Sequence, residues 1–158
     1  MNKIIIVLVS CFLILSSCSK DEPADLSYLC ANGDLWLLNR TDSLKPNHSL
    51  DSFVFNQAAG YHSFVINNSP ANNIKIDVLI KPTIGQTILY KNQYIKNIKG
   101  RLIAQDFTYD KKTDSVLTIT NNGSNYIISI KTISVTTDVA KTNYDIKVCD
   151  VKMTDTIP

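Results

Sequence analysis

The sequence predicts a single all-β domain, with an antiparallel β-sandwich as its architecture. Ile, Val, Thr, Tyr and Phe recur in short runs, which is typical of strands. Clusters of Asn, Gly, Asp, Ser and Pro separate these runs at short intervals. After residue 22, no window of twelve or more residues keeps an apolar period of 3.6 residues, which argues against helices. Many short strands joined by turns indicate two packed sheets or a barrel.

Ten segments of the chain are expected to form strands. Residues 74–78 alternate between apolar and polar, and residues 126–130 place Tyr126, Ile128 and Ile130 on one face. The expected strands are 26–31, 35–40, 52–57, 61–67, 74–80, 87–91, 100–109, 115–121, 125–136 and 143–152.

A lipocalin-like β-barrel that carries a small apolar ligand is the alternative to the sandwich. It would need a closed sheet around an interior lined by residues such as Phe53, Phe55, Phe64 and Val65. Trp36, the only tryptophan, lies among leucines, so we expect it in the core, with a sugar-stacking platform as the alternative.

The first residues predict export from the cytoplasm. A basic start at Lys3 is followed by a mostly apolar run over residues 4–15 and then by small residues, which is the order of a secretory signal. The apolar run is twelve residues long, whereas a membrane-spanning helix needs about 20. Residues 1–17 are therefore expected to act as a signal peptide rather than as a lasting anchor.

The segment Leu15-Ser16-Ser17-Cys18 resembles the lipobox of bacterial lipoproteins. This resemblance implies that the Cys18 sulfur receives a diacylglycerol, that the chain is cut just before it, and that the new amine is acylated. Two or more acyl chains hold a protein stably on a membrane. An ordinary secretory signal with an incidental Cys18 is the alternative.

The residues after Cys18 suggest where the anchored protein resides. Position 19 is Ser rather than the Asp of the inner-membrane retention signal, and Lys20-Asp21-Glu22 resembles the export signal of Bacteroidota-type surface lipoproteins. The resemblance implies an outer-membrane protein at the cell surface. A periplasm-facing position is the alternative, in which these charges only solvate a tether.

Length and charge define the rest of the chain. The chain has 158 residues. We expect residues 18–25 to form the lipidated tether, residues 26–153 to form one domain and residues 154–158 to form a tail. Of the 16 basic residues only Lys3 precedes residue 18, so 15 remain against 14 acids. This near-neutral balance gives no reason to expect nucleic acid as a partner.

The cysteines predict one disulfide. Cys11 would leave with the signal and Cys18 would carry lipid, so Cys30 and Cys149 remain as a pair in an oxidising compartment. Cys149 falls on the polar face of its strand with Lys147, so the bond should clip the outside or edge of a sheet. Two unpaired thiols are the alternative.

The sequence predicts no catalytic or metal centre and no cofactor. It contains only His48 and His62 as histidines, neither with zinc-ligand spacing, and it has no Gly-x-Ser-x-Gly elbow or phosphate loop. An aspartate-based hydrolase is an alternative, with Asp106 and Asp110 as its candidate acid pair.

One basic segment is the best candidate for ligand binding. Residues 74–105 contain Lys75, Lys81, Lys91, Lys96, Lys99 and Arg101 against the single acid Asp77. The predicted patch for an acidic glycan or a lipid head group consists of Lys91, Lys96, Lys99, Arg101, Tyr90 and Tyr94. Lysines that merely protect strand edges are the alternative.

Three short motifs resemble the Asp-Ser/Thr-aliphatic sites that are O-glycosylated in exported Bacteroidota-type proteins. They place candidate glycans on Ser43, Ser115 and Thr156. Together these features predict a surface lipoprotein that binds a glycan or an envelope protein without catalysis, with the ligand carrier and the hydrolase as alternatives.

Overall fold

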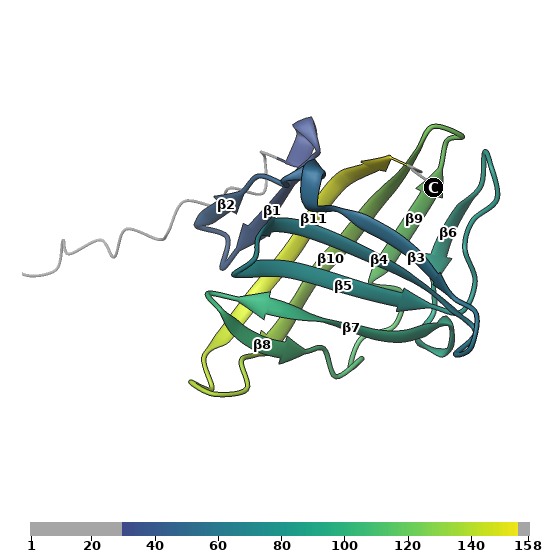
Figure 1. Cartoon of the computed structure of the whole chain (residues 1–158). Coiled ribbons are helices and arrows are strands. Elements are labelled where there is room, and N and C mark those ends of the chain that lie inside the picture. The colour runs from purple at the N-terminus through teal and green to yellow at the C-terminus, as the bar shows by residue number, and fades with distance from the viewer. Residues whose placement is uncertain (1–29, 155–158) are drawn as a thin grey trace, which may run out of the picture.

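The chain folds as two antiparallel sheets packed face to face (Figure 1). Figure 1 shows a computed structural model, which describes residues 30–154. Sheet A has six strands in the order β2-β1-β11-β10-β9-β6, and sheet B has five in the order β3-β4-β5-β7-β8. The sheets do not close into a barrel, so the predicted β-sandwich is confirmed and the lipocalin-like barrel is wrong.

The strands are β1 (Leu35–Leu38), β2 (Asp42–Leu44), β3 (Ser52–Asn56), β4 (Tyr61–Ser69), β5 (Asn72–Val78), β6 (Thr87–Tyr90), β7 (Ile95–Leu102), β8 (Gln105–Thr108), β9 (Leu117–Asn121), β10 (Asn125–Thr136) and β11 (Asn143–Thr154). Two short 3₁₀ turns, η2 (His48–Leu50) and η3 (Asn92–Tyr94), precede β3 and β7. Among the described residues, no helix is long and apolar enough to cross a membrane.

The core lies between the sheets and is filled by alternate residues of the long strands. Phe64 on β4, Ile76 on β5 and Tyr126 on β10 are all fully buried. Trp36 on β1 is also fully buried, as a core residue would be. Burying one large apolar side chain stabilises a fold by about 1.5–3 kcal/mol, so this layer is the main source of stability.

A β-bulge in β11 breaks the alternation of that strand. Val148 pairs with Ile130 and Val151 pairs with Ile128, so two residues of β11 lie opposite one residue of β10. Asp150 adopts a positive φ of 44° within this bulge. Val148 and Val151 are three residues apart and would point to opposite faces of a regular strand, but the bulge turns both into the core.

Cys30 and Cys149 form the predicted disulfide, with their Cα atoms 5.2 Å apart. Cys149 is buried, yet it lies outside the central core cluster. The bond closes against a shallow depression that Lys131 and Lys147 also line on sheet A. As expected, the disulfide clips the outside of a sheet.

Two strand predictions are wrong in the described part of the chain, and one strand was missed. Residues 30 and 31 lie in a 3₁₀ turn rather than in a strand at 26–31. The strand predicted at 100–109 is a hairpin of β7 and β8, whose turn residues Ile103 and Ala104 have φ of 51° and 61°. The short edge strand β2 was not predicted, because its three residues carry no apolar alternation.

Candidate functional site

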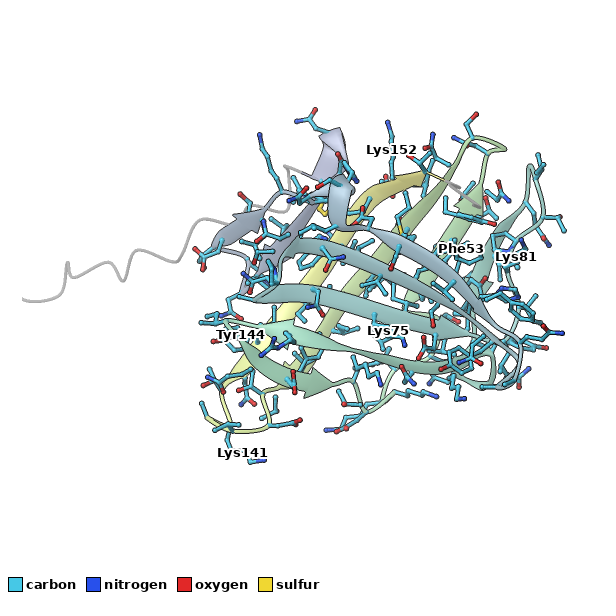
Figure 2. All side chains as sticks on the ribbon, in the orientation of Figure 1. Phe53, Lys75, Lys81, Lys141, Tyr144 and Lys152 are labelled. Atoms are coloured by element: carbon cyan, nitrogen blue, oxygen red, sulfur yellow. A yellow bond between two sulfur atoms is a disulfide. The ribbon has the colours of Figure 1, made fainter. Side chains whose placement is uncertain are left out.

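A basic depression lies on the outer face of sheet B, across β5, β7 and β8. It has a volume of about 300 Å³ and is lined by Asn73, Lys75, Lys99, Gly100, Arg101, Asp106, Phe107 and Thr108. We call it the basic trough after its cations Lys75, Lys99 and Arg101. Figure 2 marks Lys75 on β5, beside β7.

Strand register sets the spacing of the cations in the basic trough. Lys75 on β5 pairs directly with Lys99 on β7, and Lys99 pairs with Thr108 on β8. Directly opposed residues of an antiparallel pair point to the same face, so the two lysines stand side by side. Like charges in this position destabilise a sheet, so packing alone does not explain the pair.

The carboxylates nearby only partly neutralise these cations. Arg101 Nε lies 3.2 Å from Asp106 Oδ1, and Lys75 Nζ lies 3.7 Å from Asp77 Oδ1. Within residues 30–154, Lys99 forms no ion pair. The basic trough therefore keeps one unbalanced cation beside two paired ones.

Gly100 forms part of the floor of the basic trough because the backbones of β5 and β7 approach each other closely there. A Cβ added at Gly100 would lie 2.0 Å from the carbonyl oxygen of Asn73. Only glycine fits this contact without moving a strand. The close approach of the two strands therefore requires glycine between Lys99 and Arg101.

Lys96 is a further cation on the same face, outside the basic trough. The Nζ of Lys96 sits 4.0 Å from the ring centroid of Tyr61 on β4, which is cation–π distance. Tyr61 shares its face with Ser63, whose hydroxyl donates to Asp77. Asp77 is only 1% exposed although it points away from the core, so this part of the outer face is a packed polar layer rather than an open surface.

The six residues of the predicted patch do not form one surface. Lys96, Lys99 and Arg101 share β7 on sheet B. Tyr90 lies at the end of β6 in sheet A, fully buried, and its hydroxyl donates to the Ile80 carbonyl at 2.7 Å. Burial raises the pKa of Tyr90 well above its usual value, so it stays a neutral core residue.

Lys91 follows β6, and Tyr94, in η3, is 37% exposed. Neither residue lines the basic trough, and Lys75 takes their place. The sequence places Lys75 in the basic segment, but only the pairing of β5 with β7 brings it beside Lys99.

His48 bridges two carboxylates near the start of the domain. Its Nδ1 lies 2.9 Å from Asp51 Oδ2 and its Nε2 lies 3.1 Å from Asp34 Oδ2. Burial lowers the pKa of His48, but the hydrogen bonds and charges of the two aspartates outweigh it and raise the pKa above 6.5. Burial also raises the pKa of Asp51, against the lowering effect of a backbone hydrogen bond from Asn67.

His62 packs inside an aromatic cluster instead. Its ring stacks on Phe55 at a centroid distance of 4.6 Å and on Phe53 at 6.0 Å. Burial, and then the nearby Lys81, lower the pKa of His62, so the ring stays neutral at neutral pH. In the described part of the chain, no group of three or more His, Cys, Asp or Glu residues could hold a metal ion.

Asp106 and Asp110, the candidate acid pair, line different depressions. Asp106 is in the basic trough and pairs with Arg101. Asp110 lines a depression of about 510 Å³ at one end of the sandwich, where Lys112 lies 3.4 Å from its carboxylate. The two carboxylates therefore line separate depressions, whereas a two-acid hydrolase needs both beside one bond.

The candidate modification sites differ in exposure. Ser43 is exposed on the edge strand β2, whereas Ser115 is partly buried and has a φ of 58°. Thr156 and the predicted lipidation site Cys18 lie outside the described residues.

The fold and site define an antiparallel two-sheet sandwich with a cationic depression on one outer face. No protein-family model matches the sequence, and comparisons with curated proteins and with solved structures found no match. The function is therefore argued from the residues themselves.

Proposed function

We propose that this protein is a lipid-anchored, non-catalytic binding protein whose basic trough holds an acidic glycan. The observation that supports this most directly is the cross-strand pair of Lys75 and Lys99, with Arg101 beside it. A sheet that places two lysines opposite each other gives up stability. An anionic ligand between them would turn that repulsion into attraction.

The shape and lining of the basic trough suit an acidic sugar. About 300 Å³ is the lower end of the range for small-ligand sites, which is room for one or two sugar rings. Arg101 and Lys99 offer hydrogen-bond donors for a carboxylate or sulfate. Asn73 and Thr108 add side chains that can pair with sugar hydroxyls.

The binding test removes two charges from the basic trough. The Lys75→Gln/Lys99→Gln variant is compared with Lys131→Gln/Lys152→Gln, which removes two exposed charges from sheet A. Binding to immobilised polygalacturonate and chondroitin sulfate is measured, with dextran as the neutral control. We expect the trough variant to lose at least about tenfold in affinity, because two charge-assisted contacts are removed, and the sheet A variant to bind as the parent does.

Stability of the single Lys99→Gln variant gives a second readout. Because Lys99 repels Lys75 and has no ion pair within residues 30–154, its removal should leave the free energy of unfolding unchanged or slightly higher, whereas Lys75→Gln would also take the cation away from the buried Asp77. An equal loss of affinity in both double variants would indicate general charge attraction, and no binding by the parent to either anionic polymer would refute the proposed ligand.

The anchor is tested separately. The intact mass of the parent should include its acyl chains, and external protease should cut the parent on intact cells. The Cys18→Ala variant should be released from the membrane. An unacylated parent would overturn the lipid anchor, and an acylated but protected parent would place the protein on the periplasmic side.

A further inference from the structure

β3 is an edge strand of sheet B that lacks the usual protection against pairing. It reads Ser52-Phe53-Val54-Phe55-Asn56, with no charged residue and no proline. Val54 is 56% exposed and Phe55 is 53% exposed. In Figure 1, β3 has β4 on one side only. A strand edge of this kind is a ready template for another strand.

The other three edges of the sandwich are shorter, charged or covered. β2 has three residues and begins with Asp42. β8 carries Asp106, and its Phe107 forms a bridge with Thr137 near the end of β10. β6 has four residues and is followed by Lys91. Among the edge strands described, β3 is thus the longest one without a charge.

The sequence of β3 is complementary to itself. In an antiparallel pair centred on Val54, Val54 faces Val54, Phe53 faces Phe55 and Ser52 faces Asn56 of the second copy. Each apolar residue meets an apolar residue, each polar residue meets a polar one, and no like charges meet. Aromatic pairs facing each other across strands are among the favourable cross-strand contacts.

We propose that two copies of this chain pair through β3, around a two-fold axis that passes by Val54 at right angles to the sheet. The interface is isologous, as closed dimers require, and it joins the two copies of sheet B into one ten-stranded sheet. An axis at right angles to the sheet keeps both outer faces on the same side. The two basic troughs would then face the same direction, although the proposal itself rests only on the edge strand.

A cross-linking experiment tests the pairing in the full chain. A residue on the axis faces itself, and directly opposed Cα atoms in antiparallel strands lie about 4.5–5.5 Å apart, within the range that a disulfide spans. The Val54→Cys variant, oxidised on intact cells with copper-phenanthroline, should give a dimer band on non-reducing gels. Leu89→Cys is the matched control, since Leu89 is 53% exposed on β6, an edge strand of sheet A. A Val54→Cys band no stronger than that of the control would refute the pairing.

Charge substitution at the same position tests the register without a covalent bond. Val54→Lys and Val54→Glu should each sediment as monomers where the parent sediments as a dimer, because each variant places like charges opposite each other. An equal mixture of the two variants should restore the dimer, since Lys would then face Glu. Leu89→Lys should stay dimeric. A monomeric parent, dimeric charge variants, or a mixture that stays monomeric would each overturn the proposal.

Discussion

Removal of the Cys30–Cys149 disulfide should cost this domain a large part of its stability. The two cysteines are 119 residues apart, so the bond constrains almost the whole described chain in the unfolded state. For a loop of this length, the chain-entropy relation gives about 16 cal/mol/K, or about 5 kcal/mol at 25 °C. Folded domains have only about 5–15 kcal/mol in total, so the variant should be marginal.

The perturbation is Cys30→Ala, assayed by urea unfolding. Trp36 is a suitable probe, because it is the only tryptophan, it is fully buried and it pairs with Val148 beside Cys149. With an m-value of about 2 kcal/mol/M, a loss of about 5 kcal/mol lowers the unfolding midpoint by about 2.5 M. The m-value itself should rise, because an unfolded chain without the cross-link exposes more surface.

The reduced parent is the control, since breaking the bond with a thiol removes the constraint without removing a side chain. Its unfolding midpoint should match that of the Cys30→Ala variant. If the unfolding midpoint decreases by less than about 0.5 M in both samples, the disulfide does not stabilise the domain through loop closure in the unfolded state.

Two further predictions concern strain and charge. Ile103 and Ala104 are exposed turn residues, and replacing them by Asn and Gly should raise the free energy of unfolding by about 1–2 kcal/mol. The reason is that a left-handed φ is costly for Ile and Ala, whereas Asn-Gly favours it. Urea unfolding of the parent and the variant measures the difference. His48 has a folded-state pKa above 6.5, so its stabilisation is full below about pH 6.5 and is lost as the pH rises through that pKa. The parent should therefore exceed His48→Asn in stability by more at about pH 5.5 than at about pH 8, and equal differences at both pH values would contradict this.

The turn between β7 and β8 shows why one strand boundary could not be predicted. Ile103 and Ala104 form a two-residue turn with two positive φ angles, a geometry for which Asn-Gly is the usual sequence signal. Other contacts hold the turn instead: Asn72 Oδ1 accepts from the Ile103 amide, and the Ala71 carbonyl accepts from the Ala104 amide. These partners lie more than thirty residues away, so no local pattern reveals them.

The composition of the basic trough could not be predicted for a similar reason. The alternation of residues 74–78 correctly places Ile74 and Ile76 in the core and Lys75 on the outer face. The chain then crosses to sheet A for β6 and returns to sheet B for β7. Neighbours in sequence, such as Tyr90, therefore lie in the other sheet, while Lys75 and Lys99 meet across 24 positions. Charge density identified the segment, but only sheet order selects the residues that share a face.

The contacts of Cys30 and Asp34 determine where a force from the proposed N-terminal anchor would enter the fold. Cys30 is bonded to β11, which is paired with β1 on one side and β10 on the other, and Asp34 is held by His48. A pull on the proposed lipid anchor at Cys18 would thus reach an inner strand of sheet A rather than an edge strand. The disulfide lies on the outside of sheet A, whereas the basic trough lies on the outer face of sheet B. Cys30 and the basic trough thus lie on opposite outer faces of the sandwich, so the proposed anchor and the proposed ligand would engage different faces of the domain.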